Sequence, residues 1–354
     1  MAIATSYTVT SVQGAREDLS NQLKRVAPEQ TPVFSTIGSS AAPRALLTEW
    51  MVDSLGVPLF PGVVDGADLS FAGGFTDQIA DRVRLGNRIQ QVQRPFAVSR
   101  QSEIIDVAGP QSNLYGASAA KSLVLLKTDI ESAICSDDIP VTGTSSVGDK
   151  MGGLFHWTDV NATTGVWAGT SGERNFRSVG AGLAQDGSVA GTSRFSLNNT
   201  LTEAYLRQLV QAVYEAGGKS VSYNLFAGPS LVNTITDFSR AQASVTVGGV
   251  GPTLNQNIGD GSMSLSISSW ISDYGRIDII PSLFLRRESG DAFGATGRKS
   301  GLLIPKDDTV TTKTMEGITT VELPDVGGGG RRGFGDWMGT VCVLNARALG
   351  SFIT

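Results

Sequence analysis

The sequence predicts an α+β protein that is rich in strands and loops. It contains 43 glycines in 354 residues, together with abundant Ser and Thr, which indicates many turns. Most of its apolar segments are short and alternate with polar residues, as half-buried strands do. Residues 111–136 differ because they are long, carry few charges and repeat their apolar residues at the helical period.

Residues 111–136 are therefore predicted to form one long helix, which we call the spine helix. At 1.5 Å per residue such a helix would be about 39 Å long, more than a small domain needs for its own core. Its two faces differ in chemistry. The apolar face comprises Ala119, Leu123, Leu126, Ile130, Ala133 and Ile134, and the polar face comprises Lys121, Thr128 and Ser132.

Two large apolar residues of the spine helix, Val124 and Leu125, lie near the boundary of the polar face. In a monomeric globular protein such residues would be poorly covered. We expect them to contact another subunit.

The region before the spine helix is predicted to be a polar arm followed by a long hairpin. In the arm, Arg16–Val26 can form a short helix that ends at Pro28, and Pro32 favours extended backbone after it. Residues 47–53 and 89–106 alternate as strands, and the turn-rich residues between them would form a loose tip. A hairpin of this length needs neighbouring surfaces to lie on.

The region after the spine helix is predicted to begin with irregular strands and loops over residues 137–199. A helix then begins at Thr200 or Thr202 and ends at Gly217-Gly218, and a buried strand over 221–227 precedes a second helix over 230–238. Short β-branched and apolar segments follow. They predict strands over 264–270, 276–280, 301–304, 309–315, 317–323 and 338–344.

Composition excludes several classes of protein. A hydrophobic content of 40% with 17% charged residues argues against disorder, and no apolar run is long enough to span a membrane. The amino terminus lacks the features of a secretory signal, so we expect synthesis in a cytoplasm. Cys135 and Cys342 are expected to pack as small hydrophobic residues. The net charge of −5 argues against a protein whose main task is to grip nucleic acid.

The sequence offers no arrangement typical of catalysis, and no cofactor or metal is expected. His156 is the only histidine, which removes most hydrolase triads and His-based metal sites. The run over 327–332 has glycines and two arginines but lacks the residues of a P-loop, so a flexible loop is predicted. Asp137-Asp138 and Asp307-Asp308 are interpreted as solvated turns because they lack alternating oxygen ligands.

Four arginines, Arg82, Arg84, Arg88 and Arg94, form the densest basic region. They could be a solvated strand face, or they could pair with an acidic surface of an adjacent subunit. Alternation would place Arg82, Arg84 and Arg88 on one strand face. The acidic residues proposed as their partners lie on the spine helix, at Asp129 and Glu131.

Short motifs in a characteristic order run along nearly the whole chain. They include Glu49-Trp50 followed by Asp53-Ser54-Leu55, Gly66-Ala67-Asp68, Phe96-Ala97-Val98-Ser99, Met151-Gly152-Gly153-Leu154 and Ser272-Asp273-Tyr274-Gly275. With them, the sequence resembles the major capsid proteins of tailed bacteriophages, in particular the SU-ten-like subfamily. No single motif is specific, and the stretches 158–198 and 241–261 fit the pattern poorly.

The resemblance implies the Hong Kong-type capsid fold. Its parts would be an amino-terminal arm (1–45), an extended loop with flanking strands (46–107), a peripheral domain containing the spine helix (108–199), an axial domain (200–280) and a return to peripheral strands (281–354). In the founding member of this fold a loop lysine is joined covalently to a neighbouring subunit. Residues 53–106 contain no lysine, so we expect non-covalent contacts here.

The implied function is structural. Hexamers and pentamers of this chain would build an icosahedral shell around double-stranded DNA, so the protein would be found in the virion. Further partners would be scaffolding, portal or decoration proteins, with weak sequence-independent contact to the packaged DNA and none to a membrane. An encapsulin-type compartment, which would hold a cargo peptide in place of DNA, and another virion protein such as a tail tube stay open as alternatives. An enzyme is the most distant class.

Overall fold

The computed structural model describes residues 30–52, 65, 83–105, 113–138, 140–158, 194–196, 201–217, 222–243, 268–286, 299–307, 309–324 and 330–353. Its helices are α1 (Pro32–Thr36), α2 (Arg100–Ile104), α3 (Leu114–Ile134), α4 (Leu154–Trp157), α5 (Glu203–Gly217), α6 (Pro229–Ala243) and the 3-10 helix η2 (Ala346–Ala348). Its strands are β1 (Gly38–Ser40), β2 (Leu47–Val52), β3 (Val83–Arg88), β4 (Gln90–Val98), β5 (Arg194–Ser196), β6 (Tyr223–Ala227), β7 (Ser269–Ser272), β8 (Gly275–Pro281), β9 (Gly301–Pro305), β10 (Val310–Leu323), β11 (Arg331–Val343) and β12 (Gly350–Ile353).

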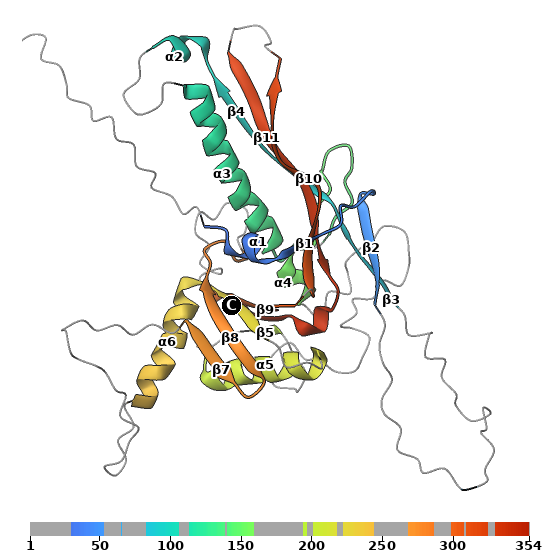
Figure 1. Ribbon diagram of the computed structural model, residues 1–354, viewed down its shortest axis with the longest axis vertical. Helices are drawn as coiled ribbons and strands as arrows, with labels where there is room; N and C mark the ends of the chain where they lie inside the picture. The colour runs from blue at the N-terminus through green and yellow to red at the C-terminus, as the bar shows by residue number, and fades with distance from the viewer. Residues whose placement is uncertain are drawn as a thin grey trace, which may run out of the picture.

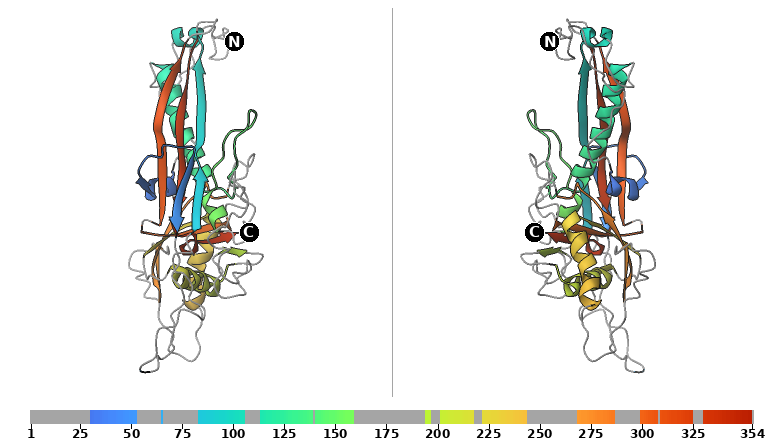
Figure 2. Two further views of the ribbon diagram at one scale, coloured as in Figure 1. Left: turned by 90° about the vertical axis from the view of Figure 1, so that its right-hand side faces the viewer. Right: turned by 90° about the vertical axis from the view of Figure 1, so that its left-hand side faces the viewer.

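The strands form three sheets, and the predicted α+β class is confirmed. A four-stranded sheet has the order β1-β10-β11-β4, a six-stranded sheet has the order β5-β12-β9-β6-β8-β7, and β2 pairs with β3. The four-stranded sheet and α3 form an elongated layer, drawn in the upper half of Figure 1, and the six-stranded sheet with α5 and α6 lies at one end of it. The side views of Figure 2 show that α3 runs along β4, β10 and β11.

The predicted spine helix is confirmed as α3, which begins at Leu114 and ends at Ile134. Its cap is Asn113, whose side-chain oxygen accepts a hydrogen bond from the N–H of Gly116 at 3.0 Å. Leu126, Ile130 and Ile134 are buried as predicted. The assignment of Thr128 to the exposed polar face was wrong. Thr128 is buried, as are Glu131 and Ile134 further along α3.

The elongated layer is held together by close packing of α3 on one face of the four-stranded sheet. Two glycines of β11 allow this approach. A Cβ at Gly335 would lie 3.3 Å from the Leu126 side chain, and a Cβ at Gly333 would lie 3.0 Å from the Tyr115 hydroxyl oxygen. Glycine at both positions therefore lets the helix lie close to the strands.

Two details of this sheet differ from the prediction. The expected strands over 309–315 and 317–323 form one strand, β10, with irregular register on both sides of Glu316. The run over 327–332 was predicted to be a loop, but Arg331 and Arg332 are the first residues of β11. Both differences arise because β11 provides a continuous partner for β10.

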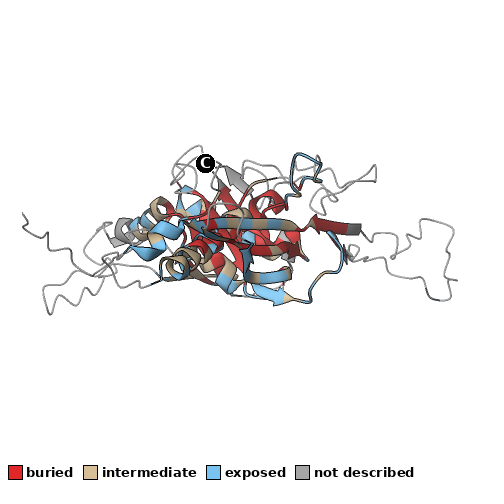
Figure 3. Cartoon of the chain, turned by 90° about the horizontal axis from the view of Figure 1, so that it is seen from above, coloured by how far each residue is buried: buried red, intermediate tan, exposed pale blue. Residues whose placement is uncertain are grey.

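The six-stranded sheet is buried on both faces. Tyr223, Leu225 and Ala227 of β6 pack with α5 and α6, while Phe226 of the same strand packs on the opposite side, in the core that includes α3. Every residue of β6 and of β9 is buried. A run of buried residues of this kind is typical of a central strand, and Figure 3 shows the buried residues concentrated along the middle of the body.

The helices on this sheet are confirmed, although α6 continues to Ala243, beyond its predicted end at residue 238. Thr202 caps α5 through a hydrogen bond from the N–H of Tyr205 to its hydroxyl oxygen, at 3.4 Å. Pro229 occupies the first turn of α6. Strands β9 and β12 belong to this sheet as well, so residues 281–354, which were assigned wholly to the peripheral domain, are divided between the two sheets.

The predicted hairpin is confirmed only in its first strand. β2 pairs with β3, with Trp50 opposite Leu85. The second hairpin strand was expected over 89–106, but β4 joins β11 in the four-stranded sheet, and Ser99 then caps the short helix α2 through its hydroxyl oxygen.

Asn87 attaches β3 to the rest of the protein through three hydrogen bonds. Its amide NH₂ donates to the carbonyl oxygens of Gly152 at 3.0 Å and Val341 at 2.9 Å, and its oxygen accepts from the N–H of Gly152.

The arm also differs from the prediction. Residues 32–36 were expected to be extended but form α1. The predicted helix Arg16–Val26 lies outside the described residues. Both cysteines are buried and free, as expected.

Candidate inter-subunit surfaces

Val124 and Leu125 lie at the middle of α3. Leu125 is exposed, with 38% of its surface accessible, and Val124 is half-buried. Neither is needed to fill the core beneath α3, which Leu126 and Ile130 occupy. Their contact with another subunit stays a prediction.

Asp129 has a partner within its own chain. Both nitrogens of one edge of the Arg94 guanidinium bond to the Asp129 carboxylate, and the Nη2–Oδ1 distance is 2.7 Å. The hydrogen bond to Asp129 raises the pKa of Arg94. This two-point ion pair links β4 to α3 along the elongated layer. Asp129 is therefore already paired before any neighbour approaches.

Glu131 was predicted to face a neighbouring subunit, and this was wrong. Its side chain is fully buried, because α1 of the amino-terminal arm covers it. The carboxylate accepts the backbone N–H of Val33 at 2.9 Å and of Phe34 at 2.6 Å. Burial raises the pKa of Glu131 to about 7, and the two backbone hydrogen bonds oppose that rise.

The three arginines are only partly described. Arg82 lies outside the described residues, and Arg84 is placed by its backbone in β3, opposite Met51. Arg88 pairs within the chain with Asp149, at 3.3 Å between Nη1 and Oδ1. Arg88 and Arg94 thus both have intramolecular partners.

The sequence analysis did not identify a further exposed surface of the described residues, which we call the outer sheet face. It is the side of the four-stranded sheet opposite α3. Residues directly opposite each other in an antiparallel pair share a face, and the register pairs Pro95 with Phe334, Phe334 with Val321, Ala97 with Arg332 and Arg332 with Leu323.

The outer sheet face carries accessible apolar residues on both sides of Arg332. Val321 and Leu323 are 38% and 39% exposed, Pro95 and Ala97 are exposed, and Phe334 is half-buried. Exposed apolar residues grouped on one face in this way are typical of an interaction surface. The alternation in residues 317–323 was a signal for it, but alternation alone does not show which face a sheet leaves uncovered.

A second exposed surface lies at the distal end of the elongated layer. Ile104 and Ile105, at the end of α2, are 75% and 64% exposed. Close by, the Arg331 guanidinium stacks on the Tyr115 ring at 4.1 Å and binds the Glu322 carboxylate at 2.9 Å. The apolar and charged groups of this end could both be used in a subunit contact.

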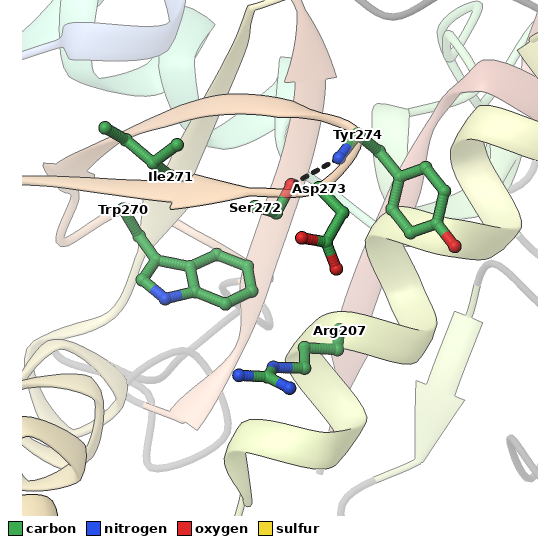
Figure 4. A pocket seen from close by; sticks show the side chains of 6 residues that line it. All are labelled: Arg207, Trp270, Ile271, Ser272, Asp273 and Tyr274. Atoms are coloured by element: carbon green, nitrogen blue, oxygen red, sulfur yellow. Dashed lines mark hydrogen bonds between the residues drawn. The ribbon is translucent and has the colours of Figure 1, made fainter.

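A small pocket lies between α5 and the β7–β8 turn (Figure 4). Its volume is about 80 Å³, and it is lined by Arg207, Trp270, Ile271, Ser272, Asp273 and Tyr274. The N–H of Tyr274 donates to the Ser272 hydroxyl oxygen at 3.3 Å, which holds the turn. The pocket is well below the size of a typical cofactor site. Ile271, one of its lining residues, has 79% of its surface exposed.

Within the described ranges, no group of three or more His, Cys, Asp or Glu residues is arranged to hold a metal ion. The sole histidine, His156, is buried in α4. No described helix combines the length and the hydrophobicity that crossing a membrane requires.

Comparisons with known proteins point to one family. The family model described as SU10 major capsid protein matches residues 3–353, whereas a search of curated proteins gave no match. Among solved structures, the capsid of a native GTA particle is 14% identical with a TM-score of 0.57 and covers 99% of both chains. A structure from Gordonia phage Cozz is 13% identical with a TM-score of 0.55, covering 99% of this chain and 96% of that one. The capsid of cyanophage P-SCSP1u is 9% identical with a TM-score of 0.54, covering 96% and 92%.

Proposed function

Because the chain belongs to the SU10 major capsid protein family, we propose that its copies assemble as hexamers and pentamers into an icosahedral shell that encloses double-stranded DNA. The family assignment makes the protein a structural subunit of a virion. The arrangement into hexamers and pentamers, the enclosed DNA and the absence of any enzymatic activity are our proposals. We also propose synthesis in the host cytoplasm before assembly.

The observation that supports assembly best is the outer sheet face. One side of the four-stranded sheet is covered by α3, while on the other side, among the described residues, Val321 and Leu323 are exposed and Phe334 is half-buried. Burying such a face against a neighbour is favourable by about 25 cal/mol per Å². Each subunit would make this contact with its neighbours in a ring, and the many modest contacts together would stabilise the shell. A single contact would be weak enough for a misplaced subunit to leave.

Within this proposal the two parts of the molecule have different positions in the shell. The four-stranded sheet with α3 would be the peripheral domain. The six-stranded sheet with α5 and α6 would be the axial domain, near the rotational axes. This assignment rests on the likeness to capsid folds and on the division of the strands into two distinct sheets.

Other partners follow from charge and from family membership. A net charge of −5 suits a container that does not grip its DNA, so weak sequence-independent contact with DNA is proposed. Scaffolding, portal and decoration proteins are proposed as further partners. Contacts of Arg82 and Arg84 with an acidic surface of a neighbouring subunit also stay proposals. Asp129 and Glu131 are not proposed as the partners, because both carboxylates bind groups of their own chain.

Assembly is tested by electron microscopy of the expressed full-length chain, wild type and the double variant Val124→Asp/Leu125→Asp. We expect shells from the wild type and dispersed subunits from the variant, because two buried charges would break the contact. Thermal unfolding of the variant should stay close to that of the wild-type subunit. Shells from the variant would exclude these two residues from the interface, and a large fall in Tm would place them in the core instead.

A further inference from the structure

The accessible side of α3 carries a positive charge next to apolar residues. We call Lys121, Val124 and Leu125 the α3 patch, because residues three and four positions apart lie next to each other on a helix. Lys121 and Leu125 are exposed, and Val124 is half-buried. Among the described residues, Lys121 forms no ion pair with a carboxylate. The α3 patch therefore offers a cation and two aliphatic side chains to another molecule.

The carboxylates of α3 do not balance this charge. Asp129 is bound by the guanidinium of Arg94 on β4. Glu131 is buried and accepts two backbone N–H groups of α1. Both carboxylates are thus engaged by groups of their own chain, while the two lysines of α3 are exposed. The solvent-facing side of α3 is therefore positive, although the whole chain has a net charge of −5.

A patch of the opposite charge lies at the end of α2. It comprises Glu103, Ile104 and Ile105, which we call the α2 patch, and all three residues are exposed. The pKa of the nearby Arg331 is raised mainly by its hydrogen bonds to Glu322 and more weakly by the charge of Glu103. In the described part of the chain, Glu103 itself forms no ion pair. Each patch thus combines one charge with two aliphatic side chains, and the two charges are opposite.

The two patches of one chain do not cover each other. α2 lies near the amino end of α3, at the distal end of the elongated layer (Figure 1). Leu125 lies eleven residues after the first residue of α3, which is about 16 Å along the helix. Ile104, Ile105 and Leu125 all keep more than a third of their surface exposed. Both patches are thus open to another molecule.

We propose that the α2 patch of one copy binds the α3 patch of the next copy, with Glu103 opposite Lys121 and the aliphatic side chains packed beside this pair. Two different patches meet in such a contact, so every copy uses its α2 patch on one neighbour and its α3 patch on another. A contact of this kind continues from copy to copy and can close into a ring. It presupposes the proposed assembly and adds to it two surfaces that meet.

A second copy fits both patches better than nucleic acid does. Phosphate groups would pair with Lys121, but they would leave Val124 and Leu125 without an apolar partner. Glu103 would repel a phosphate backbone. Another copy supplies a carboxylate and aliphatic side chains together. Apolar packing combined with complementary charges is typical of an interface between proteins.

Charge reversal in the full-length protein tests the pairing, with shells observed by electron microscopy and assembly followed by light scattering at low salt. Lys121→Glu and Glu103→Lys each place like charges opposite each other, so each should slow assembly. The double variant restores opposite charges at every contact and should assemble as the wild type does. Lys127→Glu is the matched control. It makes the same change on the same helix, about 120° away around the axis, and should leave assembly unchanged.

The effect of each single reversal should depend on salt. One exposed pair changes the affinity of a single contact by about fivefold or less, but every subunit repeats the contact. Assembly should therefore be slowed or lost at low salt and recover in part at high salt. A double variant no better than either single variant would overturn the pairing alone, whereas a wild type that stays unassembled would contradict the proposed assembly as well. Lys121→Glu shells that form at the wild-type rate but hold less nucleic acid would show that the α3 patch binds nucleic acid instead.

Disulfide formation between two variants tests the same contact without changing a charge. Ile104→Cys and Leu125→Cys are prepared separately, mixed, assembled and treated with oxidised glutathione. We expect a reducible two-chain band from the mixture and from neither variant alone, because the two native cysteines are buried. Ile104→Cys mixed with Lys127→Cys is the control and should stay single. Absence of the two-chain band from the assembled mixture of Ile104→Cys and Leu125→Cys would overturn the proposal even if the charge-reversed variants failed to fold.

Discussion

The two parts of the molecule bury their sheets in different ways. The six-stranded sheet has a core on each face, so its central strands β6 and β9 are buried along their whole length. The four-stranded sheet is buried in this way only near β2 and β3; among the described residues, its distal half has α3 on one face, and Val321 and Leu323 are exposed on the other. A sheet covered on both faces needs no partner, whereas a sheet covered on one face with apolar residues on the other does.

This comparison predicts where a substitution changes folding and where it changes assembly. Effects on the free energy of unfolding should be largest in the six-stranded sheet, smaller in the contacts that tie the elongated layer together, and smallest on the outer sheet face.

The largest effects are expected from adjacent residues of β6 that face opposite cores. Phe226→Ala should lower the free energy of unfolding by about 3–5 kcal/mol and Leu225→Ala by about 2–5 kcal/mol, because each leaves a cavity in a different core. Denaturant unfolding measures both, and Ile271→Ala on the exposed edge strand β7 is the control, with little change. If only one of the two β6 variants were destabilised, the sheet would have a core on one face only.

Asn87→Ala should have the next largest effect. The substitution leaves the carbonyl groups of Gly152 and Val341 and the N–H of Gly152 without their side-chain partner, at a cost of about 1–3 kcal/mol. Gln93→Ala, at an exposed position of β4, should be nearly neutral in the same denaturant titration. Equal stability of the two variants would show that the buried amide does not tie β3 to the body.

Asp129→Asn should cost only about 0.2–1 kcal/mol, since the pair with Arg94 is partly exposed and screened by salt. The difference from the wild type should shrink as salt is added. Thermal unfolding at low and high salt measures this. A loss that is large and independent of salt would instead mean that the pair is effectively buried.

The smallest effect on folding, and the largest on assembly, is expected from Val321→Asp/Leu323→Asp. Both side chains are already partly solvated, so the free energy of unfolding should change by about 0.5 kcal/mol or less. Shells should nevertheless be absent in electron microscopy, because the outer sheet face would carry two charges. Thr320→Asp adds a charge to the same strand on the opposite face and should still assemble; failure of both variants would point to charge on β10 in general.

The sequence by itself determined the elements whose signals are local. The helical period of residues 111–136, a cap at Thr200 or Thr202, the position of Pro229 in the first turn of α6 and the apolar run of β6 all act within a few residues of themselves. For that reason the spine helix, α5, α6, β6 and the class of the protein could be predicted without the structure. The buried state of Cys135 and Cys342 was also predictable from their apolar surroundings.

Tertiary structure decided the features whose cause lies far away in the chain. α1 is helical although Pro32 suggested extended backbone, because the acceptors for its first N–H groups come from Glu131 on α3. The same contact buries a glutamate that the helical pattern alone placed at the surface. β10 is continuous because β11 pairs with it along its length. Hydrogen-bond partners and covering elements from distant segments are absent from local sequence patterns, and so the pairing of sheets, the burial of Glu131 and the uncovered outer sheet face emerged only when the chain was folded.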